Sequence, residues 1–375
     1  MAKFSYLTTT HFDFCSRRLL TKEIQKNAMS RPLIVTDEGV KASGLLEKIT
    51  DCIDPDIDVT VFDKTPSNPT EKAVLLALEL YKSDGCDGIV SLGGGSPMDL
   101  GKAVALLANS DASLEEFDPM KKGAKRPGLV APVIAVPTTA GTGSEVSIGF
   151  VIIMDDGRKL TFGSPKFLPR VAICDPELTY GMPASLTAGT GMDAITHCIE
   201  TFLSPVVNPP ADGIALDGLW RGWRNLPKAF ANGMDHDARW QMMMASTEGA
   251  LAFGKGLGAV HALSHAVGRL KDLNLHHGTL NAVFLPTVLR FNSVDNNEKY
   301  DRLRQVMGLD PSADLSEAVM EMNVSLGLPS GLKEMGIKEE ILPGIVPFAV
   351  KDLAALSNPR NTTETDYFEM LKDAM

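Results

Sequence analysis

The hydrophobic pattern of the chain changes near residue 183, and this change limits the folds open to it. Before that point, short apolar runs such as Pro32–Thr36 and Gly88–Leu92 alternate with helical stretches of about 10 to 15 residues. Beyond Pro183 the strand-like runs stop and long helical patterns dominate. Strands that alternate with helices form a parallel sheet with helices on both faces. The sequence therefore predicts an α/β domain with a parallel sheet over residues 1–182 and an all-α domain over residues 183–375.

The size and charge of the chain limit the classes of protein to which it can belong. Its 375 residues exceed what one hydrophobic core usually holds, which favours two domains. The formal net charge is -11, and the sequence has no basic run and no patch of basic residues interleaved with aromatic ones. Nucleic acids and anionic membranes bind basic surfaces, so we expect neither as a partner.

The terminus and the cysteines indicate the compartment. Met1–Tyr6 lacks the apolar core of a secretory signal, and no apolar run approaches the length of a membrane span. The five cysteines are scattered and never lie in Cys-x-x-Cys spacing. Because that pattern is typical of reduced thiols, we predict a cytoplasmic protein.

Five of the seven histidines gather in three short stretches of the second half. Asp193 and His197 are four residues apart, as are His261 and His265, and the third stretch is His276-His277-Gly278. Residues four apart share one face of a helix and can coordinate a single ion. A carboxylate with two or three imidazoles suits iron(II) or zinc. The competing interpretation, buried histidines satisfied by one another and by carbonyls, fits a lone histidine better than this cluster.

A glycine-rich turn after the third predicted strand indicates a phosphate site. Gly93-Gly94-Gly95-Ser96 precedes a predicted helix, with Pro97 at its first position. Glycines allow backbone N–H groups to approach a phosphate, and the helix N-terminus adds a positive dipole end. Ser96 as the N-cap and Asp99 as its capping-box partner would account for part of the motif, but a plain cap needs no glycine triplet. The turn differs from the Gly-x-Gly-x-x-Gly fingerprint of ordinary dinucleotide folds.

Two further features fit a dinucleotide. The polar stretch Pro137–Glu145 follows the fourth predicted strand, where hydroxyl groups and backbone amides can hold phosphate or ribose. Asp37 follows the first strand. It either caps the next helix or binds a ribose 2′-hydroxyl, and in the second case it favours NAD over NADP.

With these motifs the chain resembles the iron-containing (group III) alcohol dehydrogenases, which have a dehydroquinate synthase-like fold. The resemblance covers nearly the whole chain and runs through several motifs in order: Ile34–Asp37, Ser67–Thr70, Gly93–Asp99, Pro137–Glu145, Asp175–Leu178, Leu186–Glu200, His261–Pro286 and Asn358–Arg360.

The resemblance implies a nucleotide-binding domain, a helical domain and a divalent metal between them, with iron(II) preferred and zinc as the alternative. It makes the metal ligands Asp193, His197, His261 and His277. His265 would lie nearer the nicotinamide as a catalytic proton relay. NAD, or alternatively NADP, would contact Asp37, Asn68, Gly94, Gly95, Ser96, Asp99, Thr138, Thr139, Thr142 and Lys159. Family members act on small alcohols and aldehydes and commonly form dimers or larger homo-oligomers.

The chain departs from the family pattern in one segment. Gly268–Leu275 is longer than usual, and His276 precedes His277, so either histidine could be the ligand. We favour His277 because it directly precedes Gly278, as the family pattern requires.

Other activities stay open at this stage. An oxo-acid reductase of the same family, of the 4-hydroxybutyrate or maleylacetate type, would need a cation for its substrate. A dehydroquinate synthase-like lyase would need a basic pocket, for which Arg269 and Lys271 are the nearest candidates. A metallohydrolase or a non-catalytic metal-binding protein would leave the glycine-rich and threonine-rich loops without a purpose.

Overall fold

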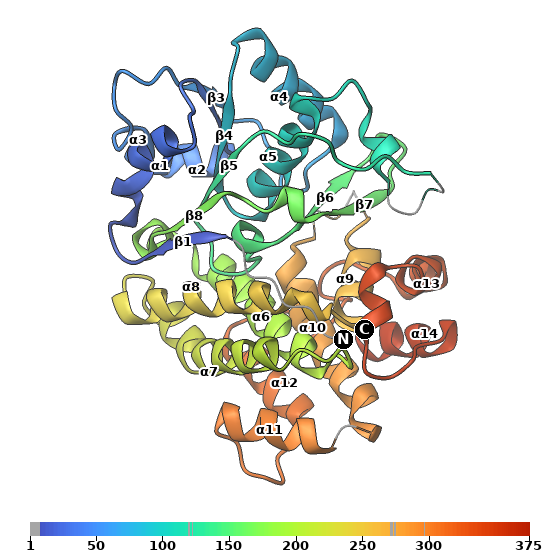
Figure 1. Ribbon diagram of the computed structural model, residues 1–375. Coiled ribbons are helices and arrows are strands. Elements are labelled where there is room, and N and C mark those ends of the chain that lie inside the picture. Colours follow the sequence, from blue (N-terminus) through green and yellow to red (C-terminus); the bar gives the residue numbers. More distant parts are fainter. Residues whose placement is uncertain (1–7, 119–120, 122, 271–272, 274, 296) are drawn as a thin grey trace. The chain divides into compact units, whose positions relative to one another are not determined.

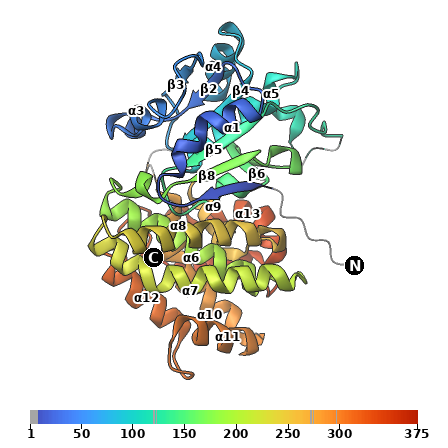
Figure 2. The same ribbon diagram turned by 60° about the vertical axis from the view of Figure 1, so that its left-hand side comes forward.

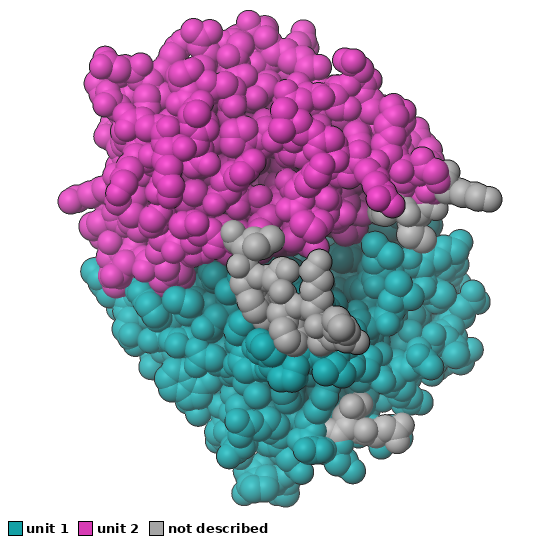
Figure 3. Space-filling model, viewed as in Figure 1, with its two compact units in different colours: residues 1–5, 140–142, 182–375 teal, residues 6–139, 143–181 magenta. Residues whose placement is uncertain are grey.

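The chain forms two compact units in a computed structural model that describes residues 8–118, 121, 123–270, 273, 275–295 and 297–375. The sheet unit comprises residues 6–139 and 143–181, and the helical unit comprises residues 140–142 and 182–375 together with 1–5 (Figure 3). Two features of the sequence, the terminus Met1–Tyr6 and Lys271, lie outside the described residues.

A six-stranded parallel sheet organises the sheet unit (Figure 1). Its strand order is β1-β8-β5-β4-β2-β3, and every neighbouring pair is parallel. The strands are β1 (Thr9–Phe12), β2 (Pro32–Val35), β3 (Thr60–Phe62), β4 (Gly88–Gly93), β5 (Val133–Pro137) and β8 (Val171–Cys174). The helices between them are α1 (Leu20–Lys26), α2 (Glu38–Ala42), α3 (Leu45–Thr50), α4 (Glu71–Ser83) and α5 (Gly95–Ala108).

Both faces of this sheet are apolar and covered, because side chains alternate between the faces along each strand. Leu33 and Ile89 pack in one core cluster with residues of α4 and α5. Their neighbours Ile34 and Val90 pack in the other cluster with residues of α1 and α3. The continuous apolar runs are thus those of a doubly covered parallel sheet. The predicted fold class is confirmed.

Two local predictions can be compared with the structure. The Asp-Gly pair of Asp155-Asp156-Gly157 predicts a hairpin turn, and the hairpin is present as β6 (Gly149–Ile153) and β7 (Lys159–Gly163), with Gly157 at φ +87°. The sequence pattern predicts one helix from Asp37 through Lys48, and this is wrong, because the structure has two helices, α2 and α3, separated at Gly44. Gly44 has φ +76°, a conformation that only glycine adopts without strain, so the helix cannot run through it.

The helical unit is built around α6, which is buried along most of its length (Figure 2). Its helices are α6 (Ala184–Leu203), α7 (Pro209–Ala231), α8 (His236–Leu251), α9 (Ala259–Val267), α10 (His277–Asn292), α11 (Asn297–Met307), α12 (Leu315–Ser325), α13 (Leu342–Val350) and α14 (Glu364–Asp373). Among the described residues, no helix is both long enough and apolar enough to cross a membrane.

Glycines allow neighbouring helices to approach α6 closely. A Cβ atom on Gly191 of α6 would lie 2.3 Å from Leu226 of α7. One on Gly278 of α10 would lie 2.2 Å from the carbonyl oxygen of Gly189 in α6. Real Cβ atoms do not approach so closely, so larger residues here would push α7 and α10 away from α6.

The contact between α5 and β4 gives a stability prediction. A Cβ on Gly101 of α5 would lie 2.0 Å from Ser91 Oγ, a buried hydroxyl without a hydrogen-bond partner among the described residues. We expect Gly101→Ala to lower the free energy of unfolding by about 1–2 kcal/mol, since overpacking outweighs the gain in helix propensity. Thermal unfolding followed by circular dichroism would measure the change.

A second substitution separates overpacking from other effects. In Gly101→Ala/Ser91→Ala the hydroxyl is gone, and the nearest remaining atoms are Ile89 Cγ2 at 3.3 Å and the Cβ of residue 91 at 3.4 Å. We expect the double variant to regain wild-type stability. Gly213→Ala in α7, where a Cβ meets no atom within 4 Å, is the control and should be neutral or stabilising. A double variant no more stable than Gly101→Ala would contradict this explanation.

Candidate functional site

The predicted ligands converge within the helical unit. Asp193 and His197 lie on the buried face of α6, with Asp193 Oδ1 3.5 Å from His197 Nε2. His261 in α9 and His277 at the start of α10 bring their Nε2 atoms to 3.9 Å and 3.6 Å from the same oxygen. Ligand atoms of Asp193, His197 and His261 all lie within 4.8 Å of one another. Segments far apart in the sequence thus meet at one carboxylate.

Each imidazole is oriented by a hydrogen-bond partner at its second ring nitrogen, Nδ1. His197 Nδ1 lies 3.2 Å from the carbonyl oxygen of Gly141, which can only accept, so this nitrogen carries the proton. His261 Nδ1 lies 2.5 Å from a carboxylate oxygen of Glu200. In all three histidines the Nε2 atoms face Asp193. Outer partners that fix the tautomer in this way are typical of metal-binding histidines.

His277, the third histidine, also has a hydrogen-bond partner at Nδ1, and this partner is the hydroxyl of Ser264. Ser264 donates its proton to the carbonyl of His261 at 3.2 Å, so its oxygen is free to accept from His277 Nδ1 at 3.4 Å. His277 therefore also presents an Nε2 lone pair to the cluster.

A single amide group tests whether a cation fits these residues. Asn281 Nδ2 lies 2.7 Å from Asp193 Oδ1 and 3.2 Å from Nε2 of both His261 and His277. An amide nitrogen has two protons, fewer than the three acceptors around it. Asn281 Oδ1 is buried with no hydrogen-bond partner among the described residues. The acceptors converge on a position where a cation would satisfy more of them, so the residues fit a divalent metal ion.

Electrostatics keep the ligands in a suitable form. Burial lowers the pKa of His197 to about 4, so its imidazole is neutral near pH 7 and its lone pair is available. Burial also opposes the charged form of His261, but the Glu200 carboxylate outweighs this and raises the pKa of that imidazole. A cation at the Nε2 side would compete with this protonation.

The structure separates the two adjacent histidines. His277 faces the cluster, whereas His276 is the N-cap of α10 and its Nδ1 accepts from the backbone N–H of Thr279 at 3.3 Å. The arrangement favours His277 over His276 as the ligand.

His265 lies beside the cluster and has an acidic partner. Its ring stacks on His277 with centroids 5.3 Å apart, and its Nδ1 lies 2.9 Å from Asp352 Oδ2. Asp352 stands just before the 3-10 helix η10 (Leu353–Ser357) and accepts from its backbone. The carboxylate therefore fixes the orientation of the imidazole.

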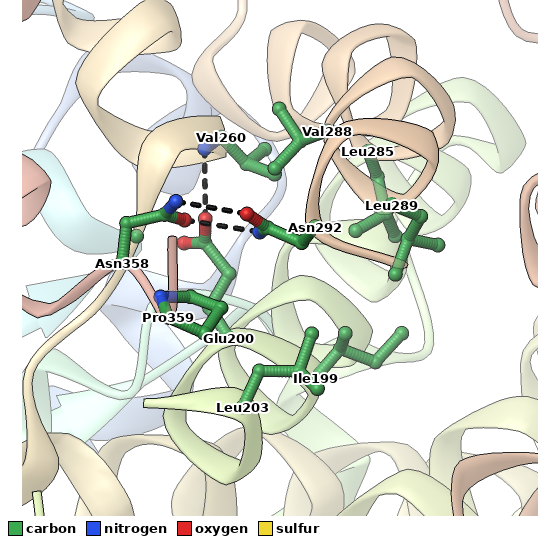
Figure 4. A pocket seen from close by; sticks show the side chains of 11 residues that line it. Ile199, Glu200, Leu203, Val260, Leu285, Val288, Leu289, Asn292, Asn358 and Pro359 are labelled. Carbon is green, nitrogen blue, oxygen red and sulfur yellow. Dashed lines mark hydrogen bonds between the residues drawn. The ribbon is translucent and has the colours of Figure 1, made fainter. Parts of the chain in front are cut away.

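Asn358 and Pro359 of the Asn-Pro-Arg motif line a small pocket beside Val260 at the start of α9 (Figure 4). Asn358 Oδ1 accepts from the N–H of Ala259 at 3.1 Å, and Asn358 and Asn292 exchange two amide hydrogen bonds of 3.0 and 2.9 Å. Glu200 lines the same small pocket and accepts from the N–H of Val260 at 2.7 Å. These contacts fix the first turn of α9, from which His261 projects.

Sequence reasoning missed Glu200, Asn281 and Asp352. Two of them had a signal. Glu200 follows Asp193 by seven residues on α6, and Asn281 follows His277 by four on α10, so each shares a face with a predicted ligand. Asp352 lies 87 residues from His265, and nothing in its local sequence indicates the pairing.

In the sheet unit the glycine-rich turn opens α5 differently from the prediction. The N-cap of α5 is Gly94, and no side chain caps the helix. The capping box of Ser96 and Asp99 is therefore wrong: Gly95 and Ser96 are already helical, and Ser96 Oγ donates to the carbonyl of Ser67 at 2.5 Å. The first turn of α5 keeps its backbone N–H groups without a side-chain partner, which suits an anion.

Asp99 holds a neighbouring loop within the sheet unit. Its carboxylate accepts from Ser144 Oγ and from the N–H of Val151, both at 3.0 Å. Lys102, one turn later on α5, donates to carbonyls of the same loop, including those of Ser144 at 2.7 Å and Gly149 at 2.8 Å. Asp99, which is half-buried, thus holds this loop in place, and its contact with the dinucleotide stays a prediction.

The other predicted cofactor residues of the sheet unit gather at its carboxyl edge. A Cβ on Gly94 would lie 3.2 Å from the Thr139 side chain, which places the turn after β4 beside the one after β5. Ligands bind at this edge of open parallel sheets. Asp37 follows β2 and accepts from the N–H of Val40 at 2.9 Å, so it does cap α2. The remaining predicted residues are Asn68 before α4, Thr138 after β5 and Lys159 at the start of β7, while Thr142 belongs to the helical unit.

Comparisons with known proteins identify the class. The sequence model described as iron-containing alcohol dehydrogenase matches residues 8–176, and the C-terminal model of the same family matches residues 187–375. A 4-hydroxybutyrate dehydrogenase of Cupriavidus necator is 51% identical, with 100% of both chains covered. The crystal structure of a 1,3-propanediol oxidoreductase superposes with a TM-score of 0.94 at 33% identity, covering 100% of both chains.

The chain belongs to the iron-containing alcohol dehydrogenase family. The resemblance seen in the sequence is confirmed, and the chain is an oxidoreductase that acts on CH–OH groups. A sulfoacetaldehyde reductase from Bifidobacterium kashiwanohense, solved in complex with NAD+, superposes with a TM-score of 0.90 at 28% identity, covering 100% of this chain and 98% of that one.

The Glu200–His261 contact gives a prediction for metal binding. In Glu200→Gln, one amide must face both the N–H of Val260 and Nδ1 of His261, and it cannot accept from both with its single oxygen. The proton of His261 is then driven toward Nε2. We expect the affinity for Zn2+ to fall by about 10- to 100-fold, measured by competition with a chelator.

A matched control is available in the sheet unit. Glu23 is also buried and its carboxylate also meets a histidine, with Oε1 3.0 Å from His11 Nε2. Glu23→Gln should leave the affinity for Zn2+ unchanged. An unchanged affinity in Glu200→Gln, or an equal loss in both variants, would disprove the role given to Glu200.

Proposed function

We propose that the chain binds a divalent metal, iron(II) in preference to zinc, through Asp193, His197, His261 and His277. The observation that supports this most is that three Nε2 atoms lie 3.5 to 3.9 Å from one Asp193 oxygen. That oxygen and two of the Nε2 atoms also surround the amide nitrogen of Asn281. Neutral imidazoles with one carboxylate are ligands that these metals take.

We also propose that residues 1–182 form the domain that binds NAD and residues 183–375 the catalytic, metal-binding domain. The dinucleotide would lie at the carboxyl edge of the sheet, with its phosphates at Gly94, Gly95 and Ser96. Its other contacts would be Asp37, Asn68, Asp99, Thr138, Thr139, Thr142 and Lys159. The backbone of the β4–α5 turn and the α5 dipole supply a suitable anion site.

The substrate we propose is a four-carbon ω-hydroxy acid and its aldehyde, 4-hydroxybutyrate and 4-oxobutanoate. The relative named for 4-hydroxybutyrate matches along the whole chain at 51% identity. Oxidation removes a hydride from the carbinol carbon and a proton from its hydroxyl, so the alcohol becomes an aldehyde while NAD+ becomes NADH.

The residues of the helical unit have separate tasks in this reaction. A bound divalent metal supplies Lewis-acid polarisation of the substrate oxygen. The carboxylate of Asp193 offsets part of the charge at the site, and Gly141, Glu200 and Ser264 keep the three imidazoles aimed inward. We propose that His265, oriented by Asp352, accepts the hydroxyl proton at Nε2 and passes it on.

Removal of the metal tests the first part of the proposal. Protein purified without air should reduce 4-oxobutanoate with NADH, lose this activity on chelation and regain it with iron(II) or zinc. Metal content and NADH oxidation would be measured on the same samples. Full turnover by protein shown to be free of metal would remove the metal from the proposed mechanism.

Asp37→Asn tests the choice of dinucleotide. The amide oxygen of asparagine can still accept from the N–H of Val40, so the cap of α2 survives while the negative charge is lost. A carboxylate near the ribose repels a 2′-phosphate, so we expect the ratio of kcat/KM for NADPH to that for NADH to rise by about tenfold or more. If Asp37 only caps α2, this ratio will not change.

Two further proposals concern the state of the protein. We propose a cytoplasmic location because the five cysteines are all free thiols. We also propose a homodimer or larger homo-oligomer, which light scattering of the purified protein would test.

A further inference from the structure

Asn281 is a buried asparagine whose amide nitrogen lies inside the ligand cluster. It follows His277 by one turn on α10, and it is 0% exposed. Its Nδ2 lies 2.7 Å from Asp193 Oδ1 and 3.2 Å from Nε2 of both His261 and His277. The reverse orientation of the amide would set Oδ1 against a carboxylate oxygen and two imidazole lone pairs. The donor end of the amide therefore faces the cluster.

The contacts of this amide differ in whether they are compatible with a bound cation. A carboxylate oxygen has more than one lone pair, so Asp193 Oδ1 can accept from Asn281 and bind a cation at the same time. An imidazole nitrogen has a single lone pair, so His261 and His277 can each serve either the amide or a cation. Metal binding therefore ends the contact of the amide with the two imidazoles and leaves its bond to the carboxylate.

We propose that Asn281 is a positioning residue that takes the place of the metal ion, because its amide protons hold the Asp193 carboxylate and two imidazoles together until an ion binds. The inference rests on the proposed metal binding. Acceptors gathered in a dry interior without a donor among them are costly, so they would turn away from one another. The amide thus keeps the ligand set assembled. It also lowers the affinity for the ion by the strength of the contacts that the ion must replace.

The helical unit offers a matched control in Asn323 of α12. This asparagine is also buried, and its Nδ2 donates to one backbone carbonyl, that of Ala282, at 2.7 Å. Its Oδ1, like that of Asn281, has no hydrogen-bond partner among the described residues. Leucine has nearly the shape of asparagine but no donor. We expect Asn323→Leu to destabilise the chelated and the metal-loaded protein equally and to leave the affinity for Zn2+ unchanged.

The test measures metal affinity and stability in the same variants. For Asn281→Leu we expect the affinity for Zn2+, measured by competition with a chelator, to rise by about 3- to 10-fold. This is the range for one neutral hydrogen bond that metal binding no longer breaks. The melting temperature of the chelated protein should fall by about 3–6 °C, and that of the metal-loaded protein should fall by less.

A second substitution covers the case in which leucine disturbs the packing of α10. Asn281→Asp keeps the size of the side chain but sets a second carboxylate against Asp193 in place of a donor. Like charges this close repel each other until a cation lies between them. The affinity for Zn2+ should therefore rise by more than in Asn281→Leu, and the chelated variant should melt at a lower temperature than the chelated wild type.

The outcomes separate this inference from the proposed function. A wild-type protein that binds neither Zn2+ nor iron(II) in the competition assay would overturn both. A wild-type protein that binds metal, with an affinity unchanged or lower in both Asn281 variants, would overturn the role of Asn281 alone. An equal loss of stability with and without metal would also overturn it, because the amide would then only support packing, as we expect for Asn323.

Discussion

Three imidazole lone pairs and one carboxylate oxygen point toward one another inside a buried helical bundle, and the rest of the site depends on this arrangement. Electron-rich atoms gathered in a dry interior are costly unless a donor or a cation lies among them. The amide nitrogen of Asn281 meets this need only partly, because its two protons serve three acceptors. A divalent cation would satisfy all of them, which is why we regard the cluster as a ligand set and not as a hydrogen-bonded core.

The helical unit supports the cluster from every side. α6 supplies Asp193 and His197, and glycine contacts allow α7 and α10 to approach it closely enough for other elements to reach the same carboxylate. Glu200, on the same face of α6, fixes both the first turn of α9 and the tautomer of His261. A single helix thus carries two ligands and the partner that orients a third.

The sequence predicts most of this from local patterns, and the misses have physical causes. Period-2 and period-3.6 patterns locate the strands and helices, and spacings of four locate the ligand pairs. The break at Gly44 depends on one backbone conformation, and the start of α5 depends on whether glycines or Ser96 cap it; neither is settled by periodicity. Asp352 reaches His265 only through the tertiary fold, so no local pattern could indicate it.

The charges of the site explain why its carboxylates are buried at all. Asp193 and Glu200 are 2% and 4% exposed, and the imidazole of His197 is neutral near pH 7. Two buried carboxyl groups beside the neutral His197 imidazole favour a positive charge at the site, and the Glu200 carboxylate accordingly raises the pKa of His261. A divalent cation would balance both carboxylates and leave His261 neutral, so metal binding and the tautomer set by Glu200 support each other. His265, four residues after His261 on α9, then places an imidazole beside the cluster that the carboxylate of Asp352 orients.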